Sequence, residues 1–173
     1  MRKAGRILLW MMGGLAALIL VELLAGALMP REHRATRALQ LKAAPEAVWT
    51  ILADHAREPQ WRPELAACVP QAERHGHPVW EDRLRNGQRI VQETLERVEG
   101  RRLVRQVVNQ PLFGGTWTWE LAPEGSGSVL RITEEGWMAA PFRPLARWGG
   151  ATSTMDAYLK ALAKRLGENS APA

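Results

Sequence analysis

The sequence predicts an α+β domain behind a single transmembrane helix, with one antiparallel sheet of seven strands closed by a long C-terminal helix. Three observations support this prediction. Residues 7–29 are almost entirely apolar, and segments of alternating apolar and polar residues separated by turn signals follow between residues 36 and 137. Apolar residues then recur at helical spacing up to Leu166. The length of 173 residues suits one domain with an appendage.

Residues 1–29 are interpreted as a membrane anchor. A helix over residues 7–29 would extend roughly 34 Å, enough to cross a hydrocarbon layer of about 30 Å. The alternative is a cleaved signal peptide, because Ala25-Gly26-Ala27 matches a cleavage site. We favour the anchor because the apolar stretch resumes beyond Glu22, its one charge.

The positive charges at the two ends of the anchor do not decide which end is cytoplasmic, because three Lys/Arg residues flank each end. The N-terminal amine favours a cytoplasmic N-terminus and an external domain, periplasmic if the protein is bacterial. Cleavage would instead give a secreted or periplasmic protein.

The formal net charge of +5 belongs mainly to the N-terminal segment. Residues 1–37 hold six Lys/Arg and two Glu, so the rest of the chain carries only +1. No basic helix or stacking motif accompanies this charge, and we therefore expect no nucleic-acid partner. The oligomeric state stays open.

The soluble part is expected to begin after a connector over residues 30–35. Residues 36–43 alternate as a strand, and "APEAVWTILADH" predicts a short helix with Pro45 in its first turn. Pro59 and Pro63 then limit the chain around Trp61 to a helical turn or a bend.

The remaining six strands are expected as a meander, since Asn86-Gly87 is a strong hairpin signal and further Gly-rich turns follow. One helix is predicted from Pro141 to Leu166, bent or interrupted at Gly149-Gly150. The tail, residues 167–173, is expected to be disordered.

The stretches "LKAAPEAVWTILADHAREPQWRPEL", "GGTWTWEL", "LRITEEG" and "STMDAYLKALAKRL" resemble the START-like superfamily, also called SRPBCC, in its polyketide cyclase/dehydrase-like and lipid-transport-like members. The resemblance covers residues 36–166. It implies a helix-grip fold, in which a curved seven-stranded antiparallel sheet wraps around the C-terminal helix and leaves a cavity for lipids, sterols, quinones or polyketides. Some members are cyclases or hydrolases, so the resemblance implies a pocket more strongly than a reaction.

The candidate cavity is bounded by tryptophans. Trp117, Trp119 and Leu121 share one strand face, and Trp61 and Trp137 are expected to join them; the alternative is that these rings complete a solid core. On residues 102–108 the register leaves open whether Arg105 or Gln106 faces inward. The expected cavity residues are Trp61, Gln106, Trp117, Trp119, Leu121, Ile132, Glu134 and Trp137.

Glu134 and His55 are the candidate catalytic residues. A carboxylate in an apolar cavity has a raised pKa and could act as a general acid; the alternative is that Glu134 pairs with an arginine or lies at the rim of the sheet. His55 is expected near the cavity mouth. Cys68, the one cysteine, is interpreted as a small buried hydrophobe, with a nucleophile as the alternative.

The His75-Gly76-His77 triplet is interpreted as a solvated turn, and we expect neither a metal nor a cofactor. His33 is expected to meet lipid headgroups.

The first functional hypothesis is a membrane-anchored module that binds an apolar or amphipathic small molecule, with membrane lipid as a second partner. The alternatives are a cyclase/dehydrase-like or hydrolase-type enzyme using the same cavity, and a protein-interaction domain without a ligand. Of these, we consider enzymatic activity less well supported than binding.

Overall fold

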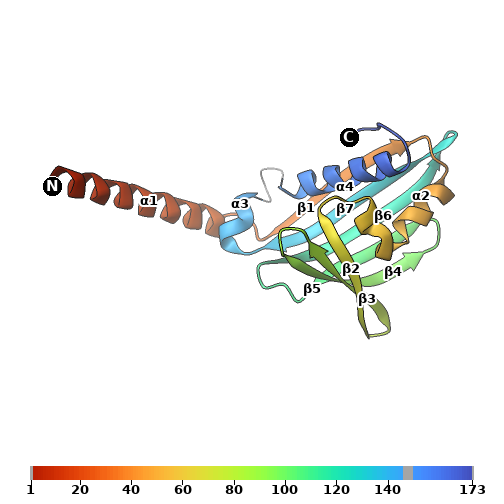
Figure 1. Cartoon of the computed structure of the whole chain (residues 1–173), viewed down its shortest axis with the longest axis horizontal. Helices are drawn as coiled ribbons and strands as arrows, with labels where there is room; N and C mark the ends of the chain where they lie inside the picture. Colours follow the sequence, from red (N-terminus) through yellow and green to blue (C-terminus); the bar gives the residue numbers. More distant parts are fainter. Residues whose placement is uncertain (1, 146–149, 173) are drawn as a thin grey trace.

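The computed structural model describes residues 2–145 and 150–172. Its first element, α1 (Arg2–Leu28), projects away from the rest of the chain (Figure 1). Residues Trp10–Leu28 have a mean hydropathy of 2.1 and are almost entirely exposed, so this helix is long and apolar enough to cross a membrane. The same properties fit a signal sequence.

Seven antiparallel strands form one sheet, which confirms the predicted fold class. The order across the sheet is β1-β7-β6-β5-β4-β3-β2, so the first and last strands are neighbours. The strands are β1 (Glu32–Leu41), β2 (Leu65–Arg74), β3 (His77–Leu84), β4 (Arg89–Val98), β5 (Arg102–Val108), β6 (Phe113–Glu124) and β7 (Gly127–Met138).

The strand β1 begins at Glu32, inside the segment expected to be a connector. Glu32 pairs with Trp137 and His33 with Gly136, so the end of β7 provides a partner for these residues. A polar stretch without apolar alternation can extend a strand in this way, because the backbone hydrogen bonds do not depend on the side chains.

Short helices precede and follow the meander. After β1 come α2 (Pro45–Leu52) and a 3-10 helix, η1 (His55–Gln60), as the sequence predicts. After β7 come η2 (Ala140–Phe142), α3 (Arg143–Leu145) and α4 (Ala151–Arg165). The predicted single helix from Pro141 is therefore divided; residues 146–149, and with them Gly149 of the predicted interruption, lie outside the described residues.

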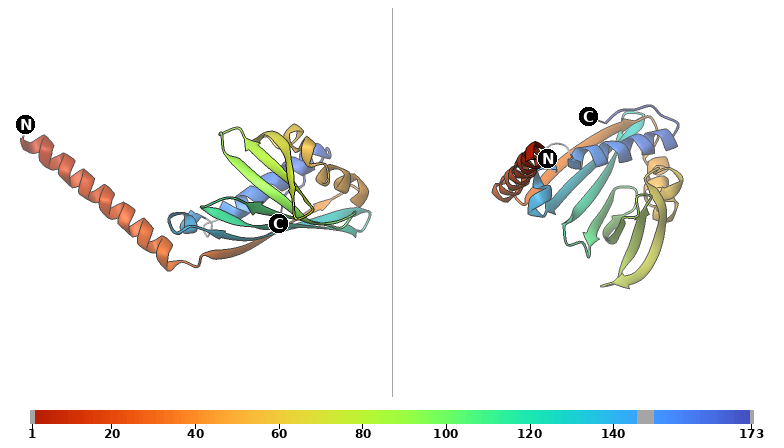
Figure 2. Two further views of the ribbon diagram at one scale, coloured as in Figure 1. Left: turned by 90° about the horizontal axis from the view of Figure 1, so that it is seen from below. Right: turned by 60° about the vertical axis from the view of Figure 1, so that its left-hand side comes forward.

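The helix α4 lies across the curved sheet, and Figures 1 and 2 show the sheet bending beneath it. Its apolar stripe is fully buried, as its spacing predicts. The stripe consists of Met155, Tyr158, Leu159, Leu162 and Ala163, and it packs against Leu39, Leu41, Trp119, Leu121, Leu130 and Ile132 of the sheet.

The start of the C-terminal tail is held in place, although we expected it to be disordered. The carboxylate of Glu168 accepts hydrogen bonds from the backbone N–H groups of Lys42, at 3.0 Å, and Ala43, at 2.9 Å. These bonds tie the end of the chain to the loop after β1.

Candidate functional site

Four aromatic rings meet between the sheet and α4. Tyr158 lies with its ring centroid 5.2 Å from Trp61, 6.1 Å from Trp117 and 5.8 Å from Trp119. We call these four residues the aromatic cluster. Trp119 is buried with Leu121 and Ile132 in the core, whereas Trp61 and Trp117 are half-buried at its edge. Three of the four expected tryptophans, Trp61, Trp117 and Trp119, thus come together, but Trp119, Leu121 and Ile132 pack as core residues.

Two polar atoms inside the aromatic cluster form no close hydrogen bond with any residue that the structure describes. They are the phenol oxygen of Tyr158 and the indole Nε1 of Trp119. Burial, together with the nearby negative charge of Glu58, raises the pKa of Tyr158 above its usual range, so the phenol keeps its proton. The indole N–H of Trp119 lies close enough to the phenol oxygen to act on its pKa as a hydrogen-bond donor. The phenol O–H is therefore the donor in the cluster for which no described residue provides an acceptor.

A buried ionic network adjoins the aromatic cluster. Glu58 on η1 accepts a hydrogen bond from Nη1 of Arg105 at 2.6 Å and one from Nη1 of Arg62 at 2.7 Å. Burial alone would raise the pKa of Glu58, but Arg105, His55 and Arg62 more than offset this and lower it to about 2. The guanidinium groups of Arg105 and Arg62 also lie over the rings of Trp119 and Tyr158, at 5.2 and 5.1 Å.

His55 belongs to the same buried network. Its Nε2 lies 2.7 Å from Oδ1 of Asp82, and its ring stacks on Trp80 with centroids 5.0 Å apart. Gln92 donates to the other oxygen of Asp82. Within the described part of the chain the remaining ring nitrogen, Nδ1, has no hydrogen-bond partner, and it lies 3.7 Å from Glu58. The expectation that His55 lies near the cavity mouth is wrong, because η1 turns its side chain toward the sheet, where it is 4% exposed.

Cys68 completes a group of residues that could ligate a metal. Ligating atoms of His55, Glu58, Cys68 and Asp82 all lie within 4.8 Å of one another. However, Glu58 is already bound by Arg105 and Arg62, whose positive charges repel a cation. Burial and the adjacent Asp82 raise the pKa of the Cys68 thiol well above its usual range. The arrangement therefore favours a hydrogen-bonded network over a metal centre.

No single motif marks this network, because its members come from η1, the turn after it and the strands β2, β3, β4 and β5. Within one segment, the signals are the His-x-x-Glu spacing of His55 and Glu58 and the four-residue spacing of Glu58 and Arg62. These spacings identify a site only once the sheet has brought Asp82 and Arg105 against η1.

Arg105, not Gln106, faces the interior from β5. Arg105 reaches Glu58 and the carbonyl oxygen of Leu52, which lie on the α4 side of the sheet. Side chains alternate along a strand, so Gln106 lies on the opposite face, paired with Glu93 and Thr116.

Trp137 also lies on the outer face, contrary to expectation. It pairs with Gly114, whereas Trp117 pairs with Glu134 on the inner face. The indole sits so close to Gly114 that a β-carbon there would come within 2.7 Å of it. The alternation of Leu130, Ile132 and Glu134 already excludes Trp137 from the inner face.

Glu134 faces inward, as expected, but its partner is a histidine rather than an arginine. Oε1 of Glu134 lies 3.0 Å from Nε2 of His33 on the neighbouring strand β1, and each side chain is 17% exposed. His33 is thus directed toward the face of the sheet instead of lying free in a connector.

His75 and Gly76 form the β2–β3 turn, as the triplet predicts, while Nδ1 of His77 lies 3.0 Å from the carbonyl oxygen of Thr94.

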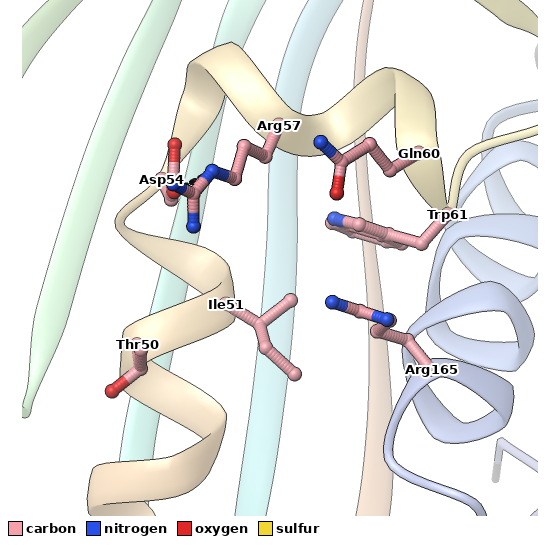
Figure 3. A pocket seen from close by; sticks show the side chains of 7 residues that line it. All are labelled: Thr50, Ile51, Asp54, Arg57, Gln60, Trp61 and Arg165. Carbon is pink, nitrogen blue, oxygen red and sulfur yellow. Dashed lines mark ion pairs between the residues drawn. The ribbon is translucent and has the colours of Figure 1, made fainter.

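A small cleft opens where α2, η1 and α4 meet (Figure 3). Its volume is about 90 Å³, below the roughly 300 Å³ at which pockets begin to hold drug-sized ligands. Trp61 projects into the cleft between Gln60 and Arg165 (Figure 3). The same indole contacts Tyr158 edge-on, so it lies between the cleft and Tyr158.

Comparison with known families matches residues 32–170 to the family described as polyketide cyclase / dehydrase and lipid transport. A search of curated proteins finds no match.

Solved structures share the fold. A START superfamily protein from Mycobacterium smegmatis is 20% identical, with a TM-score of 0.64 over 77% of this chain and 96% of its own. The Zhui aromatase/cyclase from Streptomyces sp. R1128 is 14% identical, with a TM-score of 0.64 over 78% of this chain and 93% of its own. A protein from Chromobacterium violaceum is 26% identical, with a TM-score of 0.53 over 79% of this chain and 96% of its own.

Proposed function

We propose a binding function for this chain, which belongs to the polyketide cyclase / dehydrase and lipid transport family. Between the sheet and α4, it binds an apolar small molecule that carries an oxygen able to accept a hydrogen bond. The helix α1 anchors the protein in a membrane. The chain shares with a START superfamily protein the fold in which a sheet curves around a helix, and the proposed binding site lies between these two elements.

The observation that supports this proposal most directly is the buried O–H of Tyr158, which has no acceptor among the described residues. A buried donor without a partner costs about 1–3 kcal/mol. A ligand carbonyl or ether oxygen would accept from this O–H, and the surrounding rings would cover the apolar body of the ligand. An apolar molecule without an acceptor would leave the donor unsatisfied.

Access to the aromatic cluster runs past Trp61. Its indole lines the cleft on one side and contacts Tyr158 on the other, so a rotation of this side chain would open the cleft toward Tyr158. The cleft itself is too small for the ligand, and binding therefore requires this movement.

The membrane anchor suits an apolar ligand. Such molecules partition into bilayers, and a domain tethered at the surface meets them at a high effective concentration. The membrane thus acts as the source or the destination of the ligand.

The proposal is tested with a matched pair of ligands, 9-fluorenone and fluorene, which differ by one carbonyl oxygen. With the full-length protein in lipid nanodiscs, calorimetry should show fluorenone binding about fivefold more tightly, the value of one hydrogen bond worth about 1 kcal/mol. Tyr158→Phe should remove most of this preference. Thr36→Val, which deletes a hydroxyl on the outer face, should preserve it. Equal binding of the two ligands, or no binding of either, would contradict the proposal.

A second candidate function is acid–base catalysis in the same interior, supported by the contact of His55 with Asp82. A carboxylate at Nε2 orients the imidazole and leaves Nδ1 to exchange a proton. Deuterium exchange at the α-carbon of 1-tetralone, a ketone that unlike fluorenone carries α-hydrogens, should then exceed the buffer rate and be lost in His55→Gln, with fluorenone binding retained. Glu134→Gln tests the remaining carboxylate candidate in the same assay. No exchange above the buffer rate in the parent protein would exclude this role.

A further inference from the structure

Arg143 connects the C-terminal end of α1, called here the foot of α1, to the domain through hydrogen bonds. Nη1 of Arg143 donates hydrogen bonds to the carbonyl oxygens of Gly26 and Met29, both at 3.1 Å, and lies 3.4 Å from that of Ala27. Nε of Arg143 donates to the carbonyl oxygen of Met138 at the end of β7. The last carbonyls of a helix have no partners within it, and a cation there also complements the helix dipole.

The connection between α1 and the sheet is short. Only residues 29–31 separate the end of α1 at Leu28 from the start of β1 at Glu32. Gly26 is buried although the rest of the apolar span is largely exposed, because the last turn of α1 packs against η2 and α3. Figures 1 and 2 show α3 at the foot of α1. The short connection and the hydrogen bonds of Arg143 together restrict how far the domain can rotate relative to α1.

Apolar side chains stand exposed at the same end of the domain. Leu112, in the β5–β6 loop, is 48% exposed, and Phe142 of η2 is 42% exposed. The backbone joins the two segments, because the N–H of Ala139 donates to the carbonyl oxygen of Leu112 at 2.7 Å and that of Phe142 to Ala139 at 3.0 Å. Beside them, the guanidinium of Arg31 lies 4.4 Å above the ring of Trp137. Tryptophan and arginine are typical of the membrane–water interface.

We propose that this end of the domain docks on the bilayer that α1 crosses, with Leu112 and Phe142 inserted among the headgroups and Arg143 fixing the orientation. The inference rests on the anchoring role proposed above. A helix embedded down to Leu28 brings the next residues to the interface, since each residue advances the chain by only a few ångströms. The apolar surface of α1 and the Leu112–Phe142 surface then form one continuous lipid contact. Cleavage after Ala27 would remove two of the carbonyl partners of Arg143.

The test uses the full-length chain in liposomes, with Cys68→Ala and a single introduced cysteine carrying an environment-sensitive fluorophore. Labels at positions 112 and 142 should show blue-shifted emission and quenching by brominated lipids. A label at position 124, at the distal end of β6, should behave as in water. Arg143→Ala should return the emission at position 112 toward the aqueous value, whereas Arg101→Ala at the distal end should not.

Each failure has a distinct signature. An intact mass lacking residues 1–27, or release by alkaline carbonate, would overturn the anchor and with it the docking. A chain retained in the membrane with labels 112 and 142 as aqueous as label 124 would overturn the docking alone. Protection of position 112 that depends on protein concentration and not on brominated lipid would identify a second copy of the chain as the true partner, and would also overturn it. None of these outcomes depends on fluorenone binding.

Discussion

Nη1 of Arg105 on β5 lies 2.6 Å from Oε1 of Glu58 on η1, and both side chains are almost completely buried. The contact fastens η1 to the middle of the sheet. Because Arg62 binds the second oxygen of Glu58, one carboxylate compensates two cations beneath the aromatic cluster.

Glu58→Gln should lower the free energy of unfolding by about 3–5 kcal/mol, because it leaves the buried charge of Arg105 without its partner. Urea denaturation followed by circular dichroism measures this change. Glu120→Gln, which removes an exposed partner of Arg102, is the control and should cost less than about 1 kcal/mol. Similar losses in both variants would show that Glu58 and Arg105 are not coupled as the geometry indicates.

The same pair predicts a dependence of stability on pH. The pKa of Glu58 falls from its usual 4.5 to about 2 in the folded protein. Its contribution is therefore complete above the unfolded pKa and disappears as the pH falls from about 4.5 toward 2. The slope of unfolding free energy against pH in this range should be smaller in Glu58→Gln than in the parent, and an unchanged slope would contradict the lowered pKa.

Tyr158→Phe should leave the unliganded protein as stable as the parent, or more stable by up to about 1 kcal/mol, since the deleted O–H has no acceptor among the described residues. Thr36→Val provides the contrast. Its hydroxyl lies 3.2 Å from that of Thr133, and its loss should cost about 1 kcal/mol. Thermal unfolding measures the stability of both variants. A marked destabilisation by Tyr158→Phe would mean that the hydroxyl of Tyr158 makes a hydrogen bond in solution.

Cys68 should react with iodoacetamide at pH 8 at least about tenfold more slowly than in the urea-unfolded chain, because burial and Asp82 raise its pKa. A cysteine introduced at the exposed position 75 in a Cys68→Ala background is the matched control. Mass spectrometry follows both reactions. Stoichiometric zinc that survives dialysis would contradict the prediction, since a bound metal would hold Cys68 as thiolate.

Gly115→Ala should destabilise the protein by about 2 kcal/mol or more, because the added β-carbon would lie 2.4 Å from the carbonyl oxygen of Glu135 and 2.5 Å from Cα of Gly136. Gly115 also has φ of +145°, where other residues are strained. Gly125→Ala, in an open turn at φ of +57°, carries only the backbone strain of about 1–2 kcal/mol. Equal melting temperatures of the two variants would show that β6 and β7 can separate at Gly115.

Some details of the site could be read from sequence patterns, and others could not. The parity of Leu130, Ile132 and Glu134 correctly directs Glu134 inward and would also have directed Trp137 outward. For β5 the pattern is ambiguous, because Leu103 and Val104 are both buried on opposite faces of the strand. The inward position of Arg105 became evident only from its contact with Glu58.

By itself, the sequence determined the strands, their turns, the buried stripe of α4 and the apolar span of α1, because each depends on periodicity or composition within a short segment. The tertiary structure alone decided that His55, Glu58, Asp82 and Arg105 form one buried network, and that Arg143 brackets the foot of α1. Charges far apart in the chain have no local pattern that marks their pairing. They become partners only where the curvature of the sheet removes them from water together, and there an unpaired charge would be too costly to bury.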